Sequence, residues 1–160
     1  MWALPIIAVV TCVALALRKS RWAEASWRAS RWTYCFVVPL SLLYFPFKSG
    51  FRVRPVACEW TFGWDLAIHS FRNIPHMVMF AVFFLLTWAQ LPNKRTAVLW
   101  SAAACFVMGF LVEVAEGATG IHNCRMRDLI PDMAGAAAGA VVILVARYLT
   151  GLWLDRQERP

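Results

Sequence analysis

The sequence predicts an all-α, polytopic transmembrane bundle of about five spans, in which residues 1–160 form a single membrane domain. Two observations lead to this prediction. Of the 160 residues, 61% are hydrophobic and only 16% are charged, whereas a soluble domain carries about 25% charged residues. The apolar residues also gather in long runs, separated by short connections that hold most of the Lys and Arg. The formal charge of +7 therefore reflects loop composition, and no nucleic-acid partner is expected because no nucleic-acid-binding module is recognisable.

The first two expected spans are residues 2–17 and 32–47. Residues 2–17 carry no charge and are short, since a span needs roughly 20 residues. No positive segment precedes them, so we interpret them as a retained helix and not as a signal peptide. The connector 18–31 holds five Lys or Arg and two Trp and is expected to rest on lipid headgroups. Pro39 is expected to kink the second span.

The longest connection, 48–73, is expected to contain a short helix that lies in the membrane interface. Asp65, His69 and Arg72 stand at i, i+4 and i+7, and the neighbouring apolar residues fall off that stripe. We interpret His69 as a solvated residue of the polar face and not as a ligand.

The last three expected spans, 74–91, 96–117 and 128–149, bring ionisable residues to one membrane face. The turn at 92–95 is too short to do more than return the chain antiparallel. The third span therefore begins, the fourth ends and the fifth begins on the same face, and Asp128 is a good N-cap for the fifth. We expect one polar pocket there. Its candidate ligand-binding residues are His76, Glu113, Glu116, Arg125, Arg127, Asp128 and Asp132.

Several roles for this acid-rich pocket stay open. Carboxylates at close range must be paired with cations, protonated, or bound to a cation. A purely structural role would have Arg125 capping Glu116 and the acids favouring the N-terminus of the last span. Alternatively, the pocket binds a headgroup, with the Arg residues contacting the anion and the carboxylates holding them, or it serves catalysis or a divalent cation. No catalytic residue, metal site or cofactor is assigned, because no H-E-x-x-H, G-x-S-x-G or hydroxyl beside an evident base is present.

Two further pairs of residues bear on packing. Gly135 and Gly139 form a G-x-x-x-G, which lets another helix approach closely. Cys58 and Cys124 lie in connections on the same expected face. They could pair only if that face is oxidising and the two loops meet, and the sequence leaves this undecided.

Residues 72–149 resemble the VanZ-like family of small polytopic bacterial membrane proteins. The resemblance is carried by His76-xxx-Phe80, by Glu113-Val-Ala-Glu116, and by Asp128-Leu-Ile-Pro-Asp132-Met-Ala-Gly135 followed by small residues. Glu116 stands where the family usually has Gln, and Asp132 where it usually has Asn, so both positions add negative charge. The basic turn does not clearly keep the family's Arg spacing, and residues before 72 show no matching motif.

The resemblance implies a protein of the bacterial cell envelope, and the founding member of the family is linked to resistance to the glycopeptide teicoplanin. We expect a multi-pass protein of the bacterial inner (cytoplasmic) membrane. Its N-terminus is expected outside and its C-terminus inside, because ten Lys or Arg lie on one side and six on the other. The leading hypothesis is a pocket that binds, or modulates access to, an anionic or amphiphilic envelope component. The alternatives are an accessory subunit of a larger membrane complex and a lipid-headgroup hydrolase or transferase. Membrane lipids and other membrane subunits are the expected partners.

Overall fold

The computed structural model describes residues 3–61, 63–91 and 96–157, and this part of the chain is folded into helices with no β-strand. In chain order the elements are α1 (Ala3–Ala16), α2 (Ala23–Ser41), α3 (Tyr44–Lys48), α4 (Trp64–Phe71), α5 (Ile74–Gln90), α6 (Ala97–Thr119), the 3-10 turn η1 (Met126–Asp128) and α7 (Leu129–Gln157). The all-α prediction is therefore confirmed for these residues.

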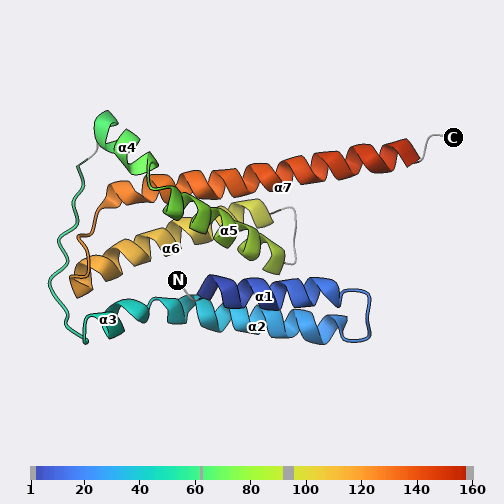
Figure 1. Ribbon diagram of the computed structural model, residues 1–160, viewed down its shortest axis with the longest axis horizontal. Helices are drawn as coiled ribbons and strands as arrows, with labels where there is room; N and C mark the ends of the chain where they lie inside the picture. Colours follow the sequence, from blue (N-terminus) through green and yellow to red (C-terminus); the bar gives the residue numbers. More distant parts are fainter. Residues whose placement is uncertain (1–2, 62, 92–95, 158–160) are drawn as a thin grey trace.

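Helices α1, α2, α6 and α7 run roughly along the length of the molecule, α5 runs obliquely to them, and α4 is bent from α5 by 70° (Figure 1). The loop 49–61, the end of α6, η1 and the start of α7 lie at one end of the bundle, at the left of the view. The α1–α2 turn, the end of α5 and the start of α6 lie toward the other end, and α7 extends well beyond its neighbours there. The ionisable residues at the start of α5, the end of α6 and the start of α7 thus share one end of the molecule.

The centre of the bundle is the pairing of α5 with α7, supported by α6. Phe80, Phe83 and Phe84 of α5 are buried, and their i, i+3, i+4 spacing puts them on one helical face. Gly139 of α7 lies against Phe84, and a Cβ atom at Gly135 would meet the Met77 carbonyl. The glycines therefore allow α5 and α7 to pack within the same chain, and they are not a free surface for a second subunit.

The α1–α2 hairpin is joined to α5 by buried polar side chains. The Gln90 amide Nε2 donates hydrogen bonds of 2.9 Å to both the Thr11 and the Ser30 hydroxyls. One turn earlier on α5, Thr87 Oγ1 lies 2.6 Å from the Tyr34 hydroxyl. Buried polar groups are stabilising when they satisfy one another and costly when they do not. These bonds consequently fix how the hairpin sits on the bundle.

The membrane-spanning character of the described helices is clear for two of them. By length and hydropathy, α6 and the stretch Met126–Thr150 can cross a membrane, and α4 with α5 could form a third span as a pair bent by 70°. Helix α1 is also apolar, but it has only 14 residues. The five-span arrangement, and the interfacial position of α4, stay predictions. The side chains of Asp65, His69 and Arg72 are exposed.

Three expected boundaries differ from the structure. Helix α2 begins at Ala23, inside the basic connector, because Ala, Glu and Arg form helix readily without an apolar run. The second expected span is divided into α2 and α3, with Pro39 near the end of α2 and a turn at Leu42–Leu43. The last helix continues to Gln157, beyond residue 149, where the fifth span is expected to end. The turn at 92–95 lies outside the described residues.

Candidate functional site

The first part of the site is a bond between α5 and α7. His76 stands in the first turn of α5 and Asp132 in the first turn of α7. The His76 Nδ1 atom lies 3.1 Å from Asp132 Oδ1, and the Asp132 side chain is only 2% exposed. A carboxylate bonded to one ring nitrogen fixes the orientation of an imidazole and favours its protonated form. The pair therefore holds the His76 ring in place at the edge of the site.

Helix α6 makes room for this pair. A Cβ atom at Gly109 would lie 2.8 Å from Asp132 Oδ2 and 2.9 Å from the Leu129 side chain. Gly109 is the last of four small residues at four-residue spacing, Ala97, Ser101, Cys105 and Gly109, all of which are buried. At Gly109 this narrow stripe brings α6 close to α7, and Glu113 continues it one turn further.

Glu113 connects α6 to the turn that precedes α7. Its side chain is 2% exposed, and its Oε2 accepts a 2.7 Å hydrogen bond from the Arg125 backbone N–H. Among the described residues, no hydrogen-bond donor reaches the other oxygen, Oε1. Glu113 thus supports the turn with Oε2, and it also forms part of the wall of a polar cavity described below.

The turn itself is clamped by the loop 51–61. Cys58 and Cys124 form a disulfide. The Glu59 N–H donates to the Cys124 carbonyl at 2.8 Å, and the Met126 N–H donates to the Glu59 carbonyl at 3.1 Å. These contacts make a short parallel β-bridge between Glu59 and Arg125. The sequence left the pairing of the two cysteines undecided, and the structure joins them.

Glu59 also receives both arginine side chains of the turn. Arg127 approaches Glu59 Oε1 at 2.9 Å and Arg125 approaches Oε2 at 3.8 Å. The hydrogen bond from the Thr61 hydroxyl, followed by the charges of Arg127 and Arg125, holds the pKa of Glu59 below its usual range. The structural alternative placed Arg125 beside Glu116, and it is wrong in that detail. Arg125 instead contacts Glu59 with its side chain and Glu113 with its backbone.

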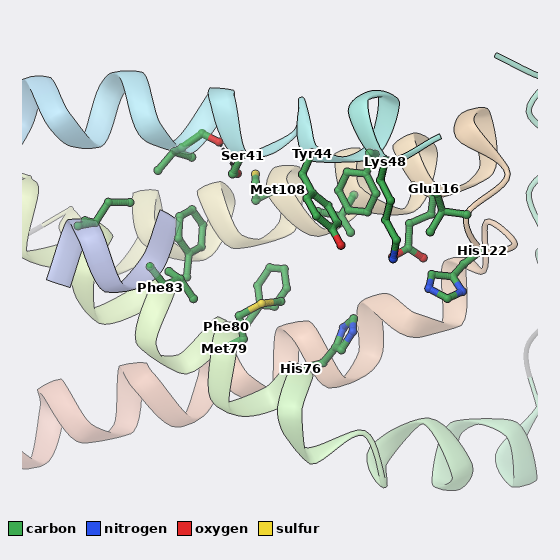
Figure 2. A pocket seen from close by; sticks show the side chains of 16 residues that line it. Ser41, Tyr44, Lys48, His76, Met79, Phe80, Phe83, Met108, Glu116 and His122 are labelled. Atoms are coloured by element: carbon green, nitrogen blue, oxygen red, sulfur yellow. Dashed lines mark hydrogen bonds between the residues drawn. The ribbon is translucent and has the colours of Figure 1, made fainter. Parts of the chain in front are cut away.

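Two adjoining cavities share part of their walls. The first, of about 560 Å³, opens between the segment α1–α3 and helices α5 and α6, and it is lined mainly by apolar side chains. The second, of about 460 Å³, is lined almost entirely by polar residues. Four residues line both cavities and mark where they meet: His76, Glu116, Ile121 and His122. Figure 2 shows this junction, with Lys48, Glu116, His122 and His76 gathered at one end and Phe80, Phe83 and Met108 further in.

The structure brings most of the candidate residues to this junction. His76, Glu113, Glu116, Arg125 and Asp128 line the polar cavity, and Asp132 lies directly behind His76. Arg127 is turned toward Glu59 and lines neither cavity.

Sequence reasoning missed Tyr44, Lys48 and His122 as lining residues and Glu59 as the partner of the arginines. One available signal was topological. Lys48 follows an aromatic run that ends at the same face as His76 and Glu116, and His122 lies between the two acidic helix ends.

The groups at the junction suit a molecule in which a polar group is attached to an apolar one. In the described part of the chain, no three His, Cys, Asp or Glu side chains are grouped so as to hold a metal ion. The polar cavity instead offers carboxylates, imidazoles and the Asn123 amide as hydrogen-bonding groups. A mostly apolar cavity with a few convergent polar groups is the ordinary form of a small-molecule site.

Comparison with known proteins gives the family of the chain. Neither the curated proteins nor the solved structures contain a match. The family model described as VanZ/LLP1 matches residues 2–147, so the likeness extends through α1 and α2, where the sequence showed no motif, as well as through the residues from 72 onward. Together with two helices that can cross a membrane, this match identifies the chain as a membrane protein that belongs to the VanZ/LLP1 family.

Proposed function

We propose that this protein binds an amphiphilic component of the bacterial cell envelope at the junction of its two cavities. The observation that carries the proposal is their continuity, because the apolar and the polar cavity share four lining residues. A ligand with an apolar part and a polar headgroup would fill both. An ordinary soluble metabolite would leave the apolar cavity unfilled, and a plain hydrocarbon would make no hydrogen bond with the polar cavity.

The protein is proposed to sit in the cytoplasmic membrane with this junction on the outer side. The disulfide between Cys58 and Cys124 supports that side, since such bonds persist where the surroundings are oxidising. The distribution of Lys and Arg favours the same orientation under the five-span arrangement. An envelope component at the outer leaflet is therefore the natural class of ligand, and any effect on glycopeptide resistance would follow from binding or withholding that component.

Blocking the apolar cavity tests the proposal. Val112 of α6 lines this cavity, and Val112→Trp would fill part of it. Val107 lies on the same helix and is 54% exposed, so Val107→Trp is the matched control. Both variants and the parent protein would be purified in mild detergent, and the amphiphiles retained would be extracted and quantified by mass spectrometry.

The parent and Val107→Trp should retain an amphiphile in comparable amounts, and Val112→Trp should lose most of it. Equal retention by all three proteins, with Val112→Trp still folded by circular dichroism, would show that the cavity is not the binding site.

A further inference from the structure

The order of charged groups along the two cavities indicates what headgroup the ligand carries. We infer that the amphiphile has a phosphate next to its apolar chains and a primary ammonium group beyond the phosphate. This inference rests on the proposed amphiphile binding and adds the chemical class of the headgroup.

The phosphate position follows from a lysine and an imidazole that border the apolar cavity. Lys48, at the end of α3, lines the apolar cavity and not the polar one. Its Nζ lies 5.5 Å from the centre of the Tyr44 ring, and no carboxylate of the described residues lies within ion-pair distance of it. His122 lines both cavities and points into the same end as Lys48 (Figure 2). An anion that follows directly on apolar chains would meet these two groups first.

The ammonium position follows from the acids further along. Glu113, Glu116 and Asp128 all line the polar cavity, whereas Lys48 does not; of the three acids, Glu116 lies at the junction and Glu113 and Asp128 line the polar cavity alone. Glu113 is buried and keeps one oxygen without a donor. Neither Glu116 nor Asp128 has an ion-pair partner among the described residues. Three carboxylates around one small cavity repel one another, and a group with several N–H donors and a positive charge would relieve this repulsion and satisfy the free oxygens.

The arginines of the turn do not reverse this charge pattern. Both guanidinium groups are directed toward Glu59, and the groups that border the polar cavity from α5, α6, the turn and η1 are the three acids, two imidazoles, Asn123 and Arg125. The cavity beyond the junction therefore favours a cation. An anionic headgroup without an amine would place its outer hydroxyls among the carboxylates. It would bind less tightly, because a hydroxyl carries no positive charge to offset theirs.

Lipid competition tests the inference. The protein, purified in mild detergent and stripped of lipid, would be mixed with equal amounts of dioleoyl phosphatidylethanolamine and dioleoyl phosphatidylglycerol and examined by native mass spectrometry. We expect phosphatidylethanolamine to be favoured about 10-fold, which corresponds to about 1.4 kcal/mol. In a second arm, dioleoyl phosphatidylcholine should bind less well than phosphatidylethanolamine, because its quaternary ammonium has no N–H to donate.

The variants separate the two halves of the headgroup. Glu116→Gln combined with Asp128→Asn should abolish the preference for phosphatidylethanolamine, and Lys48→Gln should weaken both lipids by a similar factor. Glu24→Gln, at an exposed position of α2, is the control and should behave as the parent protein does.

A preference for phosphatidylglycerol, or a preference that survives the double substitution, would overturn the inference and leave amphiphile binding intact. If Val112→Trp and the parent protein take up both lipids equally, amphiphile binding in the cavity itself fails. The two failures are therefore distinguishable.

Discussion

Substituting Gly135 with alanine should separate α5 from α7 and disturb the site at the same time. A Cβ atom at this position would approach three backbone atoms of Met77, namely its carbonyl oxygen, its carbonyl carbon and its Cα, to 3.0 Å or less. A backbone cannot swing aside as a side chain can, so the helices must move apart. Met77 follows His76, and a shift of several tenths of an ångström would stretch the 3.1 Å contact between His76 and Asp132 past the usual limit of a hydrogen bond.

The net effect on stability is the difference between two opposing contributions. Forcing a methyl group into a packed contact costs about 1–3 kcal/mol. Replacing glycine by alanine in a helix returns up to about 1 kcal/mol. Because the obstructing atoms are backbone atoms, the cost should fall in the upper part of that range, about 2–3 kcal/mol. Subtracting about 1 kcal/mol, we expect Gly135→Ala to lower the free energy of unfolding by about 1–2 kcal/mol. For a chain of this length each kcal/mol corresponds to about 2–4 °C in the melting temperature.

Thermal unfolding in mild detergent, followed by circular dichroism, measures this difference. Ala138→Leu is the control, because Ala138 is exposed on the same helix and a surface substitution should change stability by less than about 0.5 kcal/mol. A Gly135→Ala protein that melts at or above the parent temperature would show that the close approach of α5 and α7 does not limit stability, and the reasoning about the glycines would be refuted.

Three further outcomes follow from other contacts. Replacing Cys58 and Cys124 together by serine should destabilise the fold by up to about 4 kcal/mol, the chain-entropy value for a closure of 66 residues, and a variant as stable to heat as the parent would contradict this. Because the pKa of Glu59 is lowered in the fold, its contribution is present above its ordinary pKa and is lost as the pH falls through the lowered value. The melting temperature of the parent protein should therefore fall on acidification, and that of Glu59→Gln should fall less. Identical pH profiles would count against a stabilising contact of Arg125 and Arg127 with Glu59. Gln90→Leu should cost about 1–3 kcal/mol, because among the described residues the buried Thr11 and Ser30 hydroxyls would keep only their long 3.4 Å contact with each other, and chemical denaturation can measure this loss.

The local part of the site could be predicted from the sequence. Glu113 and Glu116 lie three residues apart near the end of one apolar run, and Asp128 and Asp132 lie four apart at the start of the next. Helical periodicity and antiparallel connection are enough to bring such residues to one end of a bundle. His76 joins them for the same reason, since its helix starts on that face.

The remaining features depend on packing between segments that are distant in sequence. Nothing in the spacing of Lys48 shows that α3 lies against α6, and nothing near Glu59 shows that its loop reaches the turn after α6. The polar bonds of Gln90 join three helices through single side chains, each of which resembles an ordinary helix residue. The start of α2 was missed for a different reason, because a search for apolar runs does not detect a helix that begins among charged residues.

The disulfide has a consequence for the order in which this protein is assembled. Cys58 precedes α4, α5 and α6, and Cys124 follows them. The bond can therefore form only after all three helices have been synthesised and the second cysteine has folded back to the first. The turn that holds Arg125 and Arg127, and the hydrogen bond from the Arg125 N–H to Glu113, are completed at the same stage. Under the proposed function, a chain halted before residue 124 would lack the turn that borders the polar cavity and would not bind the amphiphile.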